Sequence, residues 1–436
     1  MNQRSEFNRN FFKLASVNVL SNLMVPLAGL LDVMFLGHLT EIRHLAGVAL
    51  ATILFNYIYW TFGFLRMSTT GMVAQALGRK DNQSVLLIGL QHGILALILG
   101  CFILILQQPL QLLGFAILSA TPEVKKSGIE FYNALVWGAP ATLINFVLIG
   151  WFLGQAKSSK VLLLSAVSNC ANVLLDYLFI VKFGWESRGA GLATAISQYL
   201  MLIIGLVLCY PEISWLHLQA LKRKVFDLSA LKSALMLNGE IILRTFALIS
   251  TMAIFTNLSS MLGTQILAAN TVLMQVVGLT AYFIDGLAFA TESLAGIYQG
   301  SGNKSYLKQL LQISLISSLI IGLTFAAVFI LAPQPLFKLL TNHNEIILTL
   351  YSYVPWLLPV LGFGSIAYAL DGYFLGLTQG YILRQAMLTA TAIGFIPLAI
   401  TAWYFRNSHL LWLSMASFMA ARTITLALRL PKTVTK

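Results

Sequence analysis

The sequence predicts an all-α, polytopic membrane protein whose twelve transmembrane helices form two six-helix bundles. Of its 436 residues, 58% are hydrophobic and only 10% are charged, whereas soluble domains carry about 25% charged residues. Apolar runs recur along the whole chain, each long enough to cross a hydrocarbon core of about 30 Å. A segment of the first half is also repeated in the second half. A water-soluble fold is therefore excluded.

The apolar runs define the expected spans, which must be helical because backbone groups in lipid have to satisfy their hydrogen bonds internally. These spans cover residues 13–36, 46–76, 85–107, 128–153, 161–181, 189–209, 235–261, 265–297, 308–331, 346–377, 384–404 and 409–429. The loops between them are short and leave no room for a soluble catalytic domain. We therefore expect no enzymatic activity.

The chain divides into two halves at its longest polar connection. Residues 211–234 are expected to form a cytoplasmic linker between an N-terminal bundle at 1–210 and a C-terminal bundle at 235–436. Residues 131–155 align with residues 350–377 when a three-residue gap is allowed. The shared residues are Tyr132, Trp137 and Pro140 with Tyr351, Trp356 and Pro359, and Gly150 and Gly154 with Gly372 and Gly376.

An even number of spans in each repeat implies that both halves enter the membrane in the same sense. A pseudo-two-fold axis along the membrane normal should then relate the bundles, with a substrate site at their interface and transport by alternating access. The alternative is an accidental match of aromatic residues and glycine within apolar sequence.

The formal charge of +12 comes from basic residues that stand singly or in twos and threes between the apolar runs. This distribution orients helices rather than binding nucleic acid. We assign eighteen Lys and Arg residues, Arg384 and Arg422 among them, to inside segments and seven, including Arg406, to outside segments. The expectation is a multi-pass inner-membrane protein with both termini cytoplasmic. The cysteines have no metal-ligand spacing, and we expect no metal site.

Two acids lie at one expected depth in the N-terminal half. Asp32 precedes His38 by six residues and Asp176 precedes Lys182 by six, which places each carboxyl roughly 9 Å below the outer boundary. Two carboxyls sharing a cavity would repel each other, so one would hold a proton near neutral pH, as a proton carrier requires.

Two polar side chains belong to the same expected site. Asn172 lies one turn before Asp176, and Thr194 could add a hydroxyl at similar depth. The oxygens of this set would also suit sodium, so the coupling ion, proton or sodium, stays open. A purely structural role, in which the acids bond neighbouring helices, is the alternative.

Other intramembrane charges are secondary candidates. Glu240 and Arg244 are four residues apart, and we expect a self-neutralising intrahelical pair, with a gating or coupling role as the alternative. Arg66 lies too deep to reach the interface easily and should face an internal acid or water. Asp285 and Glu292 share a helix face, and with Asp371 they are expected in the bundle interior.

Pro26 lies in the middle of the first span, six residues before Asp32. Proline removes a backbone hydrogen bond and permits a bend. We expect a hinge at Pro26 that would reshape the space around Asp32.

At these residues the chain resembles the multidrug and toxic compound extrusion (MATE) family, and its DNA-damage-inducible (DinF-like) branch in particular. The resemblance rests on four stretches: PLAGLLDVMFLGHL around Asp32, AQALGRK after the second span, NVLLDYLFI with Asn172 and Asp176, and GAGLATAIS with Thr194.

The resemblance implies a V-shaped pair of bundles that exports organic, often cationic or amphipathic, compounds in exchange for protons or sodium. By motif match, the coupling site falls on Asp32, Asn172, Asp176 and Thr194. The other main branch of the family uses acids of the C-terminal bundle, for which Glu240 and Asp371 are nominal counterparts. The partners expected are a small organic substrate, a coupling cation and the bilayer, and we expect a monomer.

Three other functions compete with export. A flippase for a lipid-linked precursor would favour a strongly cationic cavity, a membrane-embedded enzyme would need an aqueous catalytic loop, and an ion channel would not need two repeats with buried acids.

Overall fold

The structure is a computed structural model that describes residues 3–39, 41–118, 120–212, 228–340 and 344–430. Within these ranges all regular structure is helical, and twelve helices are long and apolar enough to cross a membrane. Each of the twelve expected spans overlaps one of them. The expected boundaries differ most at the first span, which begins near residue 5 rather than 13, and at the fourth, which begins at Pro122 rather than 128.

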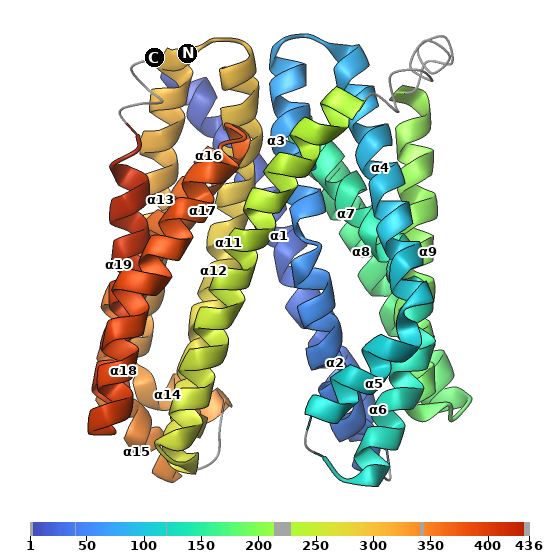
Figure 1. The fold of residues 1–436 in the computed structure, drawn as a ribbon, viewed down its shortest axis with the longest axis vertical. Helices are drawn as coiled ribbons and strands as arrows, with labels where there is room; N and C mark the ends of the chain where they lie inside the picture. Colours follow the sequence, from blue (N-terminus) through green and yellow to red (C-terminus); the bar gives the residue numbers. More distant parts are fainter. Residues whose placement is uncertain (1–2, 40, 119, 213–227, 341–343, 431–436) are drawn as a thin grey trace. The chain divides into compact units, whose positions relative to one another are not determined.

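The chain forms two compact units (Figure 1). We call residues 20–234 the N-terminal unit, and residues 1–19 together with 235–436 the C-terminal unit. This division differs from the expected one, which grouped residues 1–19 with the first half. The expected linker falls mostly on residues 213–227, outside the described residues.

Residues 1–19 group with the second half because the first part of helix α1 (Gln3–Gly37) packs there. The ring of Phe7 stacks on Tyr306 at a centroid distance of 5.6 Å. Further along α1, the backbone of Val19 lies so close to Gly286 that a Cβ on the glycine would overlap it. The aromatic contact and the close helix crossing both bury α1 surface within the C-terminal unit.

The N-terminal unit contains the second part of α1 and the helices that follow it. These are α2 (Arg43–Thr61), α3 (Phe64–Gly78), α4 (Asn82–Ile105), α5 (Gln107–Ile117), α6 (Pro122–Leu135), η1 (Val136–Gly138), α7 (Ala139–Gly154), α8 (Ser158–Asp176), η2 (Tyr177–Lys182), α9 (Glu186–Cys209) and η3 (Tyr210–Glu212).

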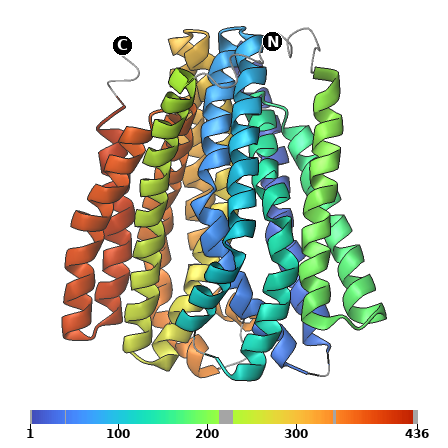
Figure 2. The same cartoon turned by 45° about the vertical axis from the view of Figure 1, so that its right-hand side comes forward.

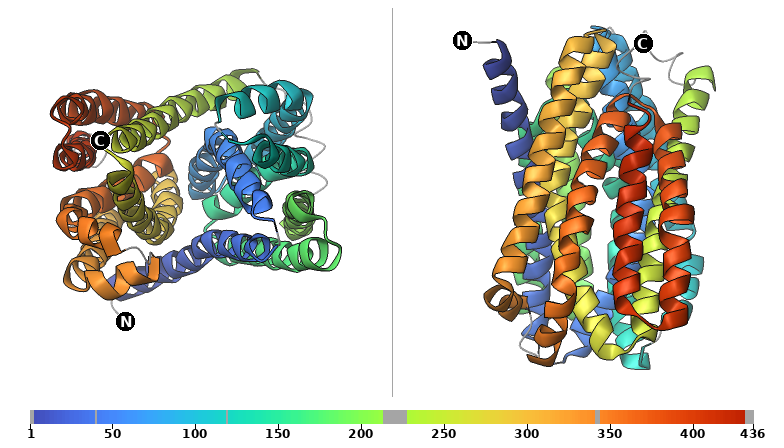
Figure 3. Two further views of the ribbon diagram at one scale, coloured as in Figure 1. Left: turned by 90° about the horizontal axis from the view of Figure 1, so that it is seen from below. Right: turned by 90° about the vertical axis from the view of Figure 1, so that its left-hand side faces the viewer.

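The C-terminal unit contains a parallel series. Its helices are α11 (Leu228–Met261), α12 (Thr264–Gly300), α13 (Lys304–Leu331), α14 (Pro333–Leu340), α15 (Asn344–Tyr353), η4 (Val354–Trp356), α16 (Leu357–Gly376), α17 (Gly380–Thr389), η5 (Ala390–Phe395), α18 (Ile396–Phe405) and α19 (Ser408–Ala427). Within this unit α18 packs beside α19 (Figure 2), and α12 packs beside α13 (Figure 3).

The internal repeat extends to irregularities that the sequence alignment did not reveal. A 3-10 turn interrupts the fourth span of each unit: η1, two residues before Pro140, in one, and η4, which contains Pro355, in the other. The fifth span of each unit contains a π-helical segment, η2 at the end of one span and η5 inside the other. Proline explains the 3-10 turns because it lacks the N–H that would continue an α-helical ladder.

The repeated Gly-x-x-x-Gly motif performs the same packing task in both units. A Cβ on Gly150 of α7 would lie 2.5 Å from the carbonyl oxygen of Arg66 in α3. A Cβ on Gly372 of α16 would lie 2.5 Å from the carbonyl oxygen of Ala288 in α12. Only glycine permits backbones to approach this closely.

Candidate functional site

The acidic pair expected from the sequence is present in the N-terminal unit. Asp32 of α1 is half-buried, and Asp176 at the end of α8 has no exposed surface. Their carboxyl groups lie within hydrogen-bonding reach of each other. Neither oxygen of Asp176 accepts a hydrogen bond from an N–H or hydroxyl donor of the described residues, and neither does Oδ1 of Asp32. The pair is therefore buried without the donors that normally stabilise carboxylates.

The two polar residues of the expected site lie beside this pair. Asn172 is one turn before Asp176 in α8, and its Nδ2 donates to Oγ1 of Thr194 in α9 at 3.3 Å. Thr194 Oγ1 donates to the carbonyl oxygen of Ala190 at 3.0 Å. The structure thus brings all four site residues of the sequence analysis into one unit, on three helices.

Close contacts join α1 to α8 and α9 to α6. Ser21 of α1 and Ser165 of α8 share a hydrogen bond of 2.7 Å between their hydroxyl groups. Gly191 of α9 lies so close to α6 that a Cβ would be 2.6 Å from the carbonyl oxygen of Phe131. Immediately after Asp176 the helix widens into η2, a π-helical segment of the kind that often marks functional sites.

Pro26 lies between Ser21 and Asp32, and α1 continues as one helix through it. The hydrogen bond at Ser21 fixes α1 on one side of Pro26, while Asp32 lies on the other side. A hinge at Pro26 remains a prediction.

A second charged cluster lies inside the C-terminal unit. Asp371 of α16 is 5% exposed, and its Oδ2 accepts hydrogen bonds from Nη2 of both Arg244 in α11 and Arg422 in α19. The Arg422 guanidinium lies 5.0 Å from the ring centroid of Tyr368, a favourable cation–π geometry. Asp285 of α12 is close enough to act electrostatically on Arg422. Two arginine side chains therefore share the Asp371 carboxylate as their counter-ion.

The expectation that Glu240 and Arg244 neutralise each other is wrong. Arg244 bonds Asp371, and Glu240 Oε2 pairs with Nε of Arg384 in α17 at 2.9 Å. Both partners lie on other helices, and a pair on another helix could not be read from spacing along α11. The intrahelical spacing was only a weak signal, worth about 0.2–0.5 kcal/mol.

The assignment of Arg422 to an inside segment is also wrong, because the residue has no exposed surface. One sequence signal could have identified it. Arg422 lies seven residues inside the expected end of the last span at 429, which is too deep for an ordinary loop charge.

The other secondary candidates are placed as follows. Glu292 is fully buried in α12, as expected for the bundle interior, and Asp285 on the same helix is half-buried. Arg66 is half-buried in α3, just after the break between α2 and α3 at Phe62 and Gly63.

Comparison with known proteins identifies the family. The MatE family model matches residues 18–178 and 241–405. The chain is 34% identical to DNA damage-inducible protein F of Escherichia coli (strain K12), over 96% of this chain and 91% of that protein. It is 24% identical to the probable multidrug resistance protein NorM of Thermotoga maritima, over 78% of this chain and 74% of that protein.

A solved structure of similar fold points to the same family. A multidrug resistance MATE family transporter of the MOP superfamily, solved in an outward-facing conformation, superposes with a TM-score of 0.87 and 22% identity. The match covers 99% of this chain and 97% of that one. With the family model matching two stretches that together make up most of the sequence, the chain belongs to the MatE family of multidrug and toxic compound extrusion (MATE) transporters, and it is not an enzyme.

Proposed function

We propose that this protein exports small organic compounds in exchange for protons carried by Asp32 and Asp176. One observation carries the proposal: the two carboxyl groups lie within reach of each other, and three of their four oxygens are buried and accept no hydrogen bond from the described residues. Two ionised carboxylates so arranged repel each other, and burial disfavours their charged forms. The arrangement is stable when the pair shares a proton or holds a cation, so its occupancy can be coupled to transport.

The neighbouring side chains are consistent with either ion. Asn172, one turn before Asp176, is hydrogen-bonded to Thr194, and both side chains carry hard oxygens of the kind that sodium prefers. We favour the proton because two acids that share one proton need no further ligand. Sodium is the alternative that the experiment below separates.

The C-terminal unit supports placing the coupling site in the N-terminal unit. Asp371 already has two guanidinium partners, Arg244 and Arg422. A cation that bound Asp371 would have to displace one of these buried charges, at a cost of several kcal/mol. We therefore infer that Asp371 is a structural acid of this protein.

The mechanism proposed is alternating access. Release of the shared proton would leave two repelling carboxylates on α1 and α8. The segment of α1 beyond Pro26 would then move relative to Ser165, with Pro26 as the hinge. The substrates proposed are cationic or amphipathic organic compounds, and one curated relative is named a probable multidrug resistance protein. We further propose an inner-membrane monomer with both termini cytoplasmic.

The test is ethidium transport in proteoliposomes of the purified protein, with an imposed pH gradient compared with an imposed sodium gradient. Transport driven by the pH gradient alone is the expected result. Transport driven by sodium alone would make the same oxygens a sodium site. No transport under either gradient would contradict multidrug export and would lead next to assays with a lipid-linked precursor.

A further inference from the structure

An apolar groove runs between α11 and α18 in the C-terminal unit. It has a volume of about 340 Å³ and is lined by Ile254, Leu258, Ile396, Ala399, Ile400 and Trp403. Ligand pockets in proteins hold roughly 300–1,000 Å³. Ile400 and Trp403 are more than half exposed, so the groove opens to the surroundings of the unit within a membrane span. Its natural content is therefore apolar and elongated.

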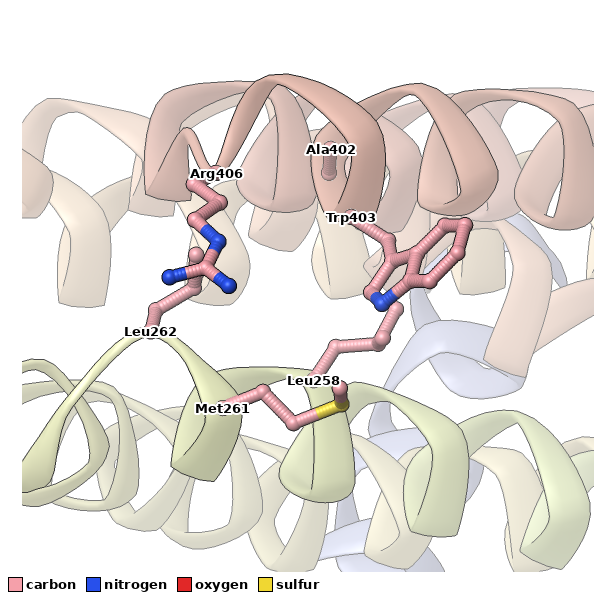
Figure 4. Close-up of a pocket in the computed structure, with 6 residues that line it drawn as sticks. All are labelled: Leu258, Met261, Leu262, Ala402, Trp403 and Arg406. Atoms are coloured by element: carbon pink, nitrogen blue, oxygen red, sulfur yellow. The ribbon is translucent and has the colours of Figure 1, made fainter.

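A basic side chain stands at one end of this groove. A smaller hollow of about 30 Å³ shares Leu258 and Trp403 with the groove and is also lined by Arg406. Figure 4 shows the Arg406 side chain extending from the end of α18 toward Leu262, the residue directly after α11. Among the described residues, its guanidinium has no hydrogen-bond or ion-pair partner. The charge is available to a ligand.

The backbone fixes Arg406 in this position. Arg406 ends α18 in a left-handed conformation, with φ of +47° and ψ of +47°, and its N–H donates to Ala402 and Trp403 carbonyl oxygens. A non-glycine residue in this region is uncommon. The turn therefore directs an arginine from the end of α18 across the groove rather than along the helix axis.

The position along the span indicates the class of ligand. The span of α17 and α18 ends at Phe405, so Arg406 lies where the hydrocarbon core meets the headgroup region. Trp403, 53% exposed, has the amphipathic ring that prefers this level. An apolar groove in the hydrocarbon with one free guanidinium at the headgroup level matches one acyl chain and one phosphate of a single lipid.

We propose that the groove between α11 and α18 binds an anionic phospholipid, with one acyl chain along Ile254 and Ile400 and the phosphate on Arg406. The bound lipid would lie beside the contact between α11 and η5, the segment before α18, where the hydroxyl groups of Thr251 and Thr391 share a hydrogen bond of 3.0 Å.

Native mass spectrometry of the purified full chain tests the proposal. The probes are dioleoylphosphatidylglycerol, which is anionic, and dioleoylphosphatidylcholine, which has no net charge, titrated separately. Arg406→Gln should weaken phosphatidylglycerol binding about fivefold, since one basic residue near a membrane surface contributes about a factor of five, and should leave phosphatidylcholine binding unchanged. Ile400→Trp should weaken binding of both lipids because the indole fills the groove.

Arg188→Gln is the matched control. Arg188 is also exposed near the end of a membrane-spanning helix, in α9 and away from the groove. The Arg188→Gln protein should bind both lipids as the wild type does. Equal losses in Arg188→Gln and Arg406→Gln would mean diffuse charge attraction and would overturn the proposal.

Two further outcomes would also overturn it. Unchanged phosphatidylglycerol binding by a folded Ile400→Trp would show that the acyl chain lies outside the groove. If Ile400→Trp does not fold, Ile254→Trp on the opposite wall is the variant to test. If ethidium displaced phosphatidylglycerol from the wild type but not from Arg406→Gln, the groove would be assigned to an amphipathic substrate. Folding of each variant is checked by its lipid-free unfolding midpoint.

Discussion

At Asp32, exchange of one carboxylate oxygen for an amide nitrogen separates coupling from folding. Asp32→Asn keeps the size of the side chain and can donate to Asp176, so we expect a folded protein. It can no longer share or release a proton, so ethidium transport driven by a pH gradient should fall to the level of protein-free liposomes. Transport at the wild-type rate would refute the role of Asp32.

Asp81→Asn is the control for that change. Asp81 begins α4 outside the membrane spans, and its side chain accepts from the Ser84 N–H at 3.0 Å. The hydrogen bonds from Ser84 hold the pKa of Asp81 below its ordinary value of 3.8, so it is ionised at neutral pH. Asparagine caps helices as well as aspartate does. Asp81→Asn should therefore transport at the wild-type rate.

Substitution of Asp371, unlike that of Asp32, should lower the stability of the protein. Asp371→Asn leaves Arg244 and Arg422 buried without their shared counter-ion, which should cost about 3–5 kcal/mol. The thermal unfolding midpoint in detergent should fall by on the order of ten degrees. The partly exposed pair of Glu240 and Arg384 provides the comparison, because Glu240→Gln should cost only about 0–1 kcal/mol.

A double variant separates charge from packing at the same cluster. Adding Arg422→Met to Asp371→Asn removes one of the two unpaired charges and should recover part of the lost stability. No recovery, or a midpoint for Asp371→Asn equal to that of Glu240→Gln, would mean that the buried charges do not determine the stability of the cluster.

The carboxyl site was readable from the sequence, and the charge cluster was not. Helical spacing places Asn172 and Asp176 on one face, and the matching distances of Asp32 and Asp176 from basic residues indicate a common depth. The pairing of Arg422 with Asp371, 51 residues apart, depends on how α16 packs on α19. Such a contact leaves no periodic signal.

At the scale of helices, the repeated glycine motif predicts matched effects in the two units. Gly150→Ala and Gly372→Ala each push a methyl group to 2.5 Å from a carbonyl oxygen, in α3 and in α12 respectively. Neither backbone can move without separating a packed helix pair, so each substitution should cost about 1–3 kcal/mol. Unfolding midpoints of the purified variants provide the measurement.

Each of these glycines has a control in its own unit. Gly93 of α4 and Gly278 of α12 are helical, and nothing lies within 4 Å of a Cβ built on either. Alanine there should be neutral or stabilising by up to about 1 kcal/mol, because it favours the helix. Equal effects at all four positions would show that helix propensity, rather than close packing, explains the motif.

Helix irregularities show the limit of sequence reasoning at this scale. The apolar runs located all twelve spans because the bilayer requires them. The 3-10 turns had a visible cause in Pro140 and Pro355, whereas the π segments η2 and η5 contain no proline. Most of their residues are apolar, apart from Lys182 and Thr391, and nothing in their sequence marks the wider turn.

For the whole molecule, the repeat and the polar connection predict bundles at 1–210 and 235–436 with a linker at 211–234. In the structure one compact unit resumes at Leu235, and the first residues of the chain, 1–19, group with it. The sequence offered no boundary inside α1, because residues 13–36 form a single predicted span. The sequence analysis therefore assigned the whole of α1 to the N-terminal bundle, although its first part packs in the C-terminal unit.

Membrane orientation decides from which side a proton reaches Asp32. The distribution of basic residues predicts that Thr121, in the loop before α6, is outside and that Ser301, after α12, is inside. Both side chains are exposed. In a chain without Cys101, Cys170 and Cys209, we expect an impermeant maleimide to label Thr121→Cys in intact cells and Ser301→Cys only after permeabilisation. Asp32 and Asp176 lie five and six residues before the helix ends at Gly37 and Lys182, on the side of Thr121, so this pattern puts the carboxyl pair near the outer face, where an inward proton arrives first. The reverse pattern would place the pair near the cytoplasm, and proton entry at Asp32 and Asp176 could no longer begin the transport cycle.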